Sequence, residues 1–117
     1  MQAVQISREL LPDCWDDAEK LVSNEVTKNI AGQLYAAMGS ILANLGEGYS
    51  RSSGKDRAKF FEYALGSVRE TMMWYRTSVR LLGQETVDSR LDKLEQVRRL
   101  LLATIPRERD RVVRPRR

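Results

Sequence analysis

The chain has 117 residues, enough for one helical domain, and a net charge of +4 with no histidine. The absence of histidine excludes Ser-His-Asp and Cys-His catalysis, His-ligated zinc and a di-iron site built on Glu-x-x-His motifs. Cys14 is the single cysteine, so no intrachain disulfide can form, and a reducing, cytoplasmic setting is expected. No apolar run reaches the roughly 18 residues of a membrane span, and the first residues lack the pattern of a signal peptide.

Charge is distributed unevenly along the chain. Residues 1–50 hold three basic and seven acidic side chains, residues 51–105 hold eleven and seven, and residues 106–117 hold six and two. Such a gradient favours either an acidic partner or complementary packing between subunits, and it does not decide between them.

Residues 2–22 are expected to form the first of four helices. One side carries an apolar row of Val4, Leu10, Leu11, Trp15, Ala18 and Leu21. Pro12 lacks a backbone N–H, and Asp13 with Asp16 resembles a helix start. The sequence therefore predicts a first helix that is short, or kinked at Pro12.

A second helix is expected over about residues 24–46. Its apolar positions recur at 4-3-4 spacing, with a second stripe beside them, and they comprise Ile30, Leu34, Ala37, Ile41, Ala31, Tyr35, Met38, Leu42 and Leu45. A ridge of small residues runs alongside: Gly32, Ala36, Gly39, Ser40 and Ala43. Because glycine is unfavourable in a helix, this ridge indicates close approach of another helix. Gly46 and Gly48 are expected to end the helix.

A third helix is expected over about residues 54–82, begun by a capping-box variant of Ser53 and Asp56 and closed by Gly83. Its apolar positions repeat without a gap: Phe61, Leu65, Val68, Met72, Tyr75, Val79 and Leu82. A flanking row that includes Phe60, Trp74 and Leu81 widens the apolar arc to roughly half of the circumference. One neighbouring helix cannot cover this arc, so we expect three packed neighbours or a subunit interface at those three residues.

A fourth helix is expected over about residues 86–105, where Pro106 ends the pattern. Residues 106–117 are rich in arginine and are expected to form a flexible tail. The sequence thus predicts an all-α, antiparallel, up-down four-helix bundle over residues 1–105, which assembles into a homo-oligomer.

The turn between the second and third helices is the obvious candidate for a functional site. Glu47 can accept backbone N–H bonds or pair with Arg51, which favours a structural corner formed by Asn44, Glu47, Gly48 and Tyr49. Catalysis would need a partner acid or base, and none is visible. The spacing from Gly48 to Lys55 is one residue too long for a phosphate loop. Helix capping and anion binding both remain open for residues 51–55.

The basic residues fall into two sets. The first follows the corner and the third helix, where it either tracks a phosphate backbone or is a solvated surface: Arg51, Lys55, Lys59, Arg69, Arg76 and Arg80. The second is the tail, which is either a nucleic-acid arm or a solubilising terminus: Arg107, Arg109, Arg111, Arg114, Arg116 and Arg117.

Two segments carry a family resemblance: SILANLGEGYSR at residues 40–51, and FEYALGS at residues 61–67 followed by Glu70. They resemble the four-helix-bundle family of proteins encoded by intervening sequences in 23S rRNA genes. The accessory variability determinants of diversity-generating retroelements are similar proteins. The chain departs from the family pattern at Leu42, where many relatives have proline, and at Gly46, where alanine is usual.

The resemblance implies an antiparallel bundle, commonly assembled as a barrel-like homopentamer, with no established enzymatic activity. For the retroelement branch it implies a basic surface that engages nucleic acid and a reverse transcriptase. We therefore expect a non-enzymatic oligomer without cofactors that binds RNA or DNA without base specificity. The alternative is a protein-interaction scaffold in which charge sets subunit register and partner choice.

Overall fold

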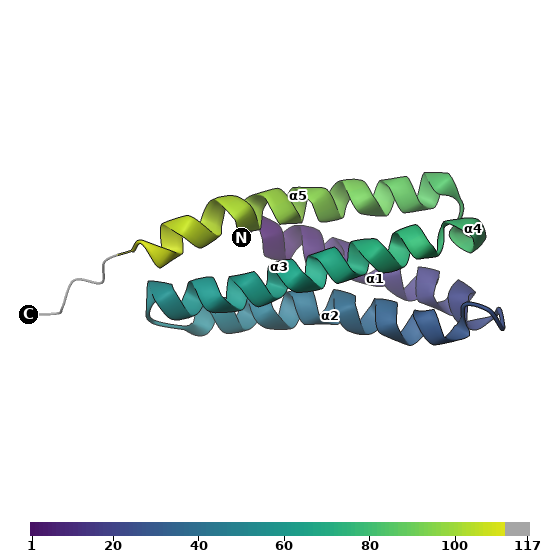
Figure 1. Cartoon of the computed structure of the whole chain (residues 1–117), viewed down its shortest axis with the longest axis horizontal. Coiled ribbons are helices and arrows are strands. Elements are labelled where there is room, and N and C mark those ends of the chain that lie inside the picture. The colour runs from purple at the N-terminus through teal and green to yellow at the C-terminus, as the bar shows by residue number, and fades with distance from the viewer. Residues whose placement is uncertain (112–117) are drawn as a thin grey trace, which may run out of the picture.

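The computed structural model describes residues 1–111 as five helical segments. They are α1 (Gln2–Val22), α2 (Lys28–Ser50), α3 (Gly54–Thr77), the single turn α4 (Val79–Leu82) and α5 (Gln84–Arg109). The long helices lie side by side in a rod of 60 × 21 × 18 Å (Figure 1). Around the rod, α1 packs on α2, α2 on α3, α3 on α5 and α5 on α1. The prediction of an all-α fold is confirmed.

The core of the bundle is the apolar side of each long helix. The largest fully buried side chains are Tyr75, Phe61, Leu10, Leu21, Leu34, Met38, Ile41, Leu45, Leu94, Leu101, Val68 and Val87. On α3 and α4, every residue of the predicted repeat is buried except Val79 of α4, which is partly buried. Helices α2 and α5 of the same chain cover this face, so its width does not by itself require a second subunit.

The prediction of a short first helix is wrong, because α1 runs from Gln2 to Val22 without interruption at Pro12. Proline leaves the carbonyl four residues earlier without a helical partner, and this carbonyl belongs to Arg8. Both residues are exposed, so water can satisfy the carbonyl at little cost. Helix α1 ends where Thr27 donates its hydroxyl to the Leu21 carbonyl at 2.7 Å. Helix α2 therefore begins at Lys28, four residues later than predicted.

Gly46 and Gly48 do not end α2, which continues to Ser50. Gly48 is required inside the helix, since a Cβ there would lie 2.4 Å from Cε1 of the buried Phe61 ring. Gly46 has open space where a side chain would be.

The third helix breaks at Ser78, which separates α3 from α4. The Ser78 hydroxyl donates to the Trp74 carbonyl at 2.7 Å, and the Thr77 hydroxyl donates to the Met73 carbonyl at 2.8 Å. Such hydroxyls compete with the helical backbone bonds. Gly83, with φ of 88°, then closes α4, as its sequence position predicted.

Pro106 does not end the last helix, because α5 continues to Arg109. The carbonyl that loses its partner belongs to Leu102, which is 43% exposed. Residues 106–109, predicted as part of the tail, are therefore helical.

Candidate functional site

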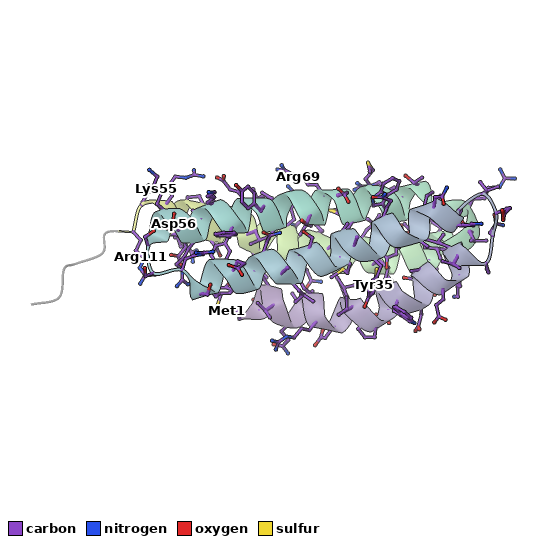
Figure 2. All side chains as sticks on the ribbon, turned by 90° about the horizontal axis from the view of Figure 1, so that it is seen from below. Met1, Tyr35, Lys55, Asp56, Arg69 and Arg111 are labelled. Carbon is purple, nitrogen blue, oxygen red and sulfur yellow. The ribbon has the colours of Figure 1, made fainter. Side chains whose placement is uncertain are left out.

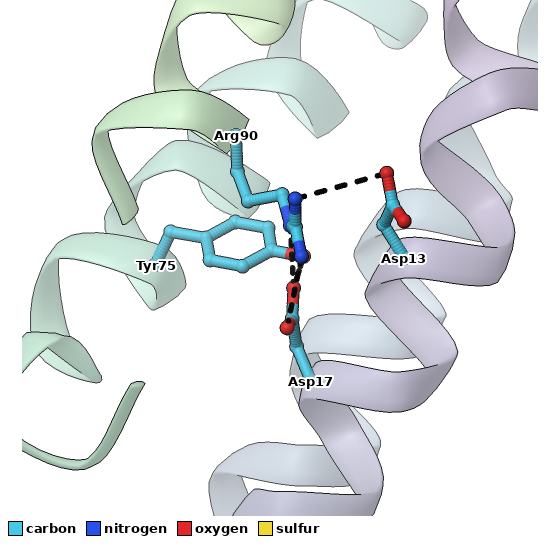
Figure 3. Close-up of polar contacts among 4 residues, drawn as sticks. All are labelled: Asp13, Asp17, Tyr75 and Arg90. Atoms are coloured by element: carbon cyan, nitrogen blue, oxygen red, sulfur yellow. Dashed lines mark hydrogen bonds and ion pairs between the residues drawn. The ribbon is translucent and has the colours of Figure 1, made fainter. Parts of the chain in front are cut away.

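A buried polar cluster joins three helices of the bundle (Figure 3). Asp17 of α1 is only 1% exposed and accepts a hydrogen bond from the Tyr75 hydroxyl at 2.7 Å. It also accepts two from Arg90 of α5, from Nε at 2.8 Å and from Nη2 at 3.3 Å. Asp13 lies 3.7 Å from Arg90 on the outer side. The cluster therefore fixes the relative positions of α1, α3 and α5.

The environment of this cluster shifts three pKa values. The hydrogen bonds that Arg90 donates to Asp17 raise the pKa of Arg90, so its charge persists. Burial raises the pKa of the Tyr75 hydroxyl, which stays protonated and able to donate. Burial also raises the pKa of the neighbouring Cys14 thiol to about 11. With Cys14, Asp17 and Tyr75 all at most 1% exposed, a substrate cannot reach them, and their role is structural.

Cys14 should resist thiol reagents until the protein unfolds. Only the thiolate reacts, and burial suppresses both access and ionisation. Because the folded pKa of about 11 exceeds the ordinary 9.0, the stability that Cys14 contributes is present below pH 9 and is lost as pH rises toward 11. Titration with a chromogenic disulfide reagent at pH 8 should show negligible reaction of the native protein and one thiol per chain in denaturant. Rapid native labelling would contradict the packing.

The predicted corner is a set of contacts at one end of the bundle. Glu47 pairs with Arg51 at 2.8 Å, and the Arg51 guanidinium lies 4.7 Å from the centre of the Phe60 ring. The Tyr49 ring packs 4.8 Å from Phe61. Asn44 donates to the Ser40 carbonyl at 2.9 Å, which anchors the preceding turn.

The start of α3 is capped as predicted, because the Asp56 N–H donates to the Ser53 hydroxyl at 3.1 Å. The capping explanation of the Ser-rich turn is thus confirmed for Ser53.

The last turn of α5 docks on this same corner. Glu108 accepts ion pairs from Arg57 at 3.2 Å and from Arg111 at 3.4 Å, and Arg109 pairs with Glu62. A Cβ on Gly54 would lie 2.1 Å from the Glu108 carbonyl oxygen, so the two backbones approach too closely for a side chain. These contacts hold the C-terminal end of α5 beside the start of α3.

Cations gather at this end of the rod. Residues 1–11, 40–65 and 96–111 hold ten basic and six acidic side chains. Two of these ten, Arg98 and Arg99, pair with Glu95, just outside this set. The other half, residues 12–39 and 66–95, holds seven and ten. The described chain is therefore polarised along its long axis, positive where Lys55 and Arg111 lie (Figure 2).

The structure separates the basic residues that the sequence grouped together. Arg51, Lys55, Lys59, Arg107, Arg109 and Arg111 belong to the positive end. Arg69 lies near the middle of α3, and Arg76 lies about 32 Å along the helix from Lys55 (Figure 2). Arg80 follows on α4. Arg114, Arg116 and Arg117 lie outside the described residues.

The three residues predicted for a subunit interface differ in how exposed they are. Phe60 and Trp74 are partly buried within the chain, and Trp74 Nε1 is buried with no hydrogen-bond partner among the described residues. Leu81 is 39% exposed, on α4 beside a groove formed with Val26 and Ile30.

Comparison with known proteins agrees with this architecture. The model of the 23S rRNA-intervening sequence protein family matches residues 1–103. The chain belongs to this family. A crystal structure from Bacteroides thetaiotaomicron, of a protein with unknown function from the S23 ribosomal protein family, is similar, with a TM-score of 0.82 and 22% identity. The match covers 88% of this chain and 97% of that one, and at this identity it shows the shared fold. A search of curated proteins found no match.

In this member of the 23S rRNA-intervening sequence family, no helix within residues 1–111 is both long enough and apolar enough to cross a bilayer. In this part of the chain, Cys, Asp and Glu side chains form no group of three suited to a metal ion.

Proposed function

We propose that the protein is a non-enzymatic, self-assembling bundle that binds nucleic acid through the phosphate backbone at its positive end. The observation that carries the proposal is the clustering of cations around the α2–α3 turn and the end of α5. Lys55, Lys59 and Arg107 are exposed there and make no ion pair with other described residues. Three further arginines, Arg114, Arg116 and Arg117, follow Arg111 in the sequence.

The chemistry of this end favours binding without base specificity. Exposed Lys and Arg side chains contact phosphates, which carry no sequence information. The family name refers to 23S rRNA, and the similar structure is assigned to a ribosomal protein family. RNA is therefore the first ligand to test. Service as an accessory subunit of a reverse transcriptase in a retroelement is one form of this function, and it rests on the resemblance alone.

Affinity for a short single-stranded RNA of mixed sequence should fall steeply between about 50 and 200 mM salt, because binding releases counterions. Replacing Lys55, Lys59 and Arg107 with glutamine should weaken binding and flatten the logarithmic salt slope by about 2, if each contacts one phosphate. Truncation after Arg111 should flatten it further. Fluorescence anisotropy over a salt series measures both effects.

A matched variant separates local contact from overall charge. Lys20, Arg80 and Lys93, which lie in the other half, are replaced with glutamine for the same change in net charge. This variant should bind nearly as the parent does. Equal loss in both variants would contradict a site at the positive end, and absence of binding at low salt would contradict the function itself.

The second candidate is a scaffold for another protein. An apolar groove between α1 and α2, lined by Trp15 and Tyr35, favours it. A scaffold should purify free of nucleic acid, and a defined protein should remain bound to it in pull-downs. A scaffold retains no nucleic acid, so replacing Arg69, Arg76 and Arg80 with glutamate should not change the nucleic-acid content of the purified protein.

A further inference from the structure

One aromatic ring lies on the outer surface of α3, close to the positive end. Tyr63 is 49% exposed. The other exposed aromatic ring of residues 1–111 is Trp15 of α1, which contacts Tyr35. A single exposed ring is common on protein surfaces, so the surroundings of Tyr63 decide whether it can bind a ligand.

The Tyr63 ring is held in place by its neighbours. Its plane stands at 87° to the Phe60 ring, with 5.7 Å between the ring centres. The Arg51 guanidinium lies over Phe60, and it pairs with Glu47. These contacts enclose Phe60, which is partly buried, and leave Tyr63 as the ring with free surface. A ring that is already fixed loses little conformational freedom when a ligand stacks on it.

Two lysines lie on the same face of α3 as Tyr63. Lys59 and Lys55 precede it by four and eight residues, which places them about 6 and 12 Å along the axis toward the α2–α3 turn. Both are exposed and make no ion pair with other described residues. In the other direction, Gly66 has open space where a side chain would be. The ring is therefore unobstructed on one side and followed by cations on the other.

Acidic side chains limit the positive charge of this face. Glu62 is exposed but pairs with Arg109, whereas Asp56 and Glu70 are exposed and make no ion pair with other described residues. Asp56 and Glu70 each lie seven residues from the ring, about 10 Å along the axis. Residues 47–63 hold four basic and three acidic side chains, so attraction of phosphates does not by itself select this face. Glu70 also disfavours a strand that continues past the ring toward α4.

We propose that Tyr63 stacks on an unpaired base of single-stranded nucleic acid, whose backbone passes over Lys59 and Lys55 toward the α2–α3 turn. Aromatic side chains stack on bases of any type, since every base has a π face. In a duplex the bases are stacked on each other, so their faces cannot reach a ring on the protein surface. This inference rests on the proposed nucleic-acid function and names the form of nucleic acid that the positive end prefers.

The test compares Tyr63→Ala with the parent on a short single-stranded RNA of mixed sequence and on the duplex of the same sequence. Loss of the stacked base should weaken single-strand binding at least about fivefold. Duplex affinity should not change, and neither should the salt slope of single-strand binding, because no charge is removed. Fluorescence anisotropy measures both affinities, and circular dichroism should show the helical content of the parent, since alanine favours a helix.

Two further variants serve as controls. Met73 is 46% exposed on the outer side of the same helix, ten residues from Tyr63 and away from the lysines. Met73→Ala should therefore bind both RNAs as the parent does. Tyr63→Phe keeps the ring and loses only the hydroxyl, so it should keep single-strand binding.

The outcomes separate this inference from the proposed function. If Tyr63→Ala binds the single strand as the parent does, while the variant of Lys55, Lys59 and Arg107 is weak, the positive end is a nucleic-acid site and the stacking is overturned. Equal losses on the single strand and the duplex would also overturn the stacking, since a stacked base is present only in the first. A parent that binds neither RNA contradicts both proposals.

Discussion

Replacing Asp17 with alanine should lower the free energy of unfolding by about 3 kcal/mol. The carboxylate is 1% exposed and neutralises Arg90 while it accepts the Tyr75 hydroxyl. Its removal leaves a guanidinium that is 19% exposed, and a buried hydroxyl, each without this partner. Denaturation in urea, followed by circular dichroism, measures the loss.

Two variants locate the source of that effect. Asp16→Ala removes an exposed carboxylate one residue away and should change stability by less than about 0.5 kcal/mol. Tyr75→Phe removes one hydrogen bond and keeps the charge pair, so it should cost about 1 kcal/mol. If Asp17→Ala proves as mild as Asp16→Ala, the cluster does not hold the three helices together.

Alanine at Gly48 and alanine at Gly46 should have opposite effects on stability, although the two sites are two residues apart on one helix. At Gly48 the new Cβ overlaps the buried Phe61 ring, and such overpacking should cost at least about 1 kcal/mol. At Gly46 the space is open, so alanine should stabilise the helix by up to about 1 kcal/mol. Thermal unfolding of both variants at low protein concentration measures the difference.

The comparison is internally controlled, since both variants change the same residue type in the last two turns of α2. An equal gain of stability at both sites would show that the glycine pair acts through helix propensity alone, and would contradict the contact of Gly48 with Phe61. Loss of stability at Gly46 would indicate an atom in contact with that face in the dilute protein.

Apolar periodicity predicted the long helices, because buried side chains must recur along one side of each. It could not place their ends. Gly48 is typical of a helix end, but here it admits Phe61, a contact between residues on two helices. Pro12 and Pro106 break hydrogen bonds only on exposed sides, and exposure follows from packing that the sequence does not state.

The functional features were partly accessible from the sequence. Asp17 continues the inward spacing of Leu10, Cys14 and Leu21, and an acid in an inward row is a signal of a buried ion pair. Its partners could not be named, since Tyr75 and Arg90 lie 58 and 73 residues away. The sequence also showed the excess of cations after residue 50. Their concentration at one end depends on antiparallel packing, which brings residues 51–59 beside residues 107–111.

Photo-crosslinking of bound single-stranded RNA, read out by mass spectrometry, tests most directly whether the positive end is the nucleic-acid site. We expect crosslinked peptides to cover residues 51–59 and 107–111. Crosslinks concentrated on α4 and the first turns of α5, or none at low salt, would contradict the account.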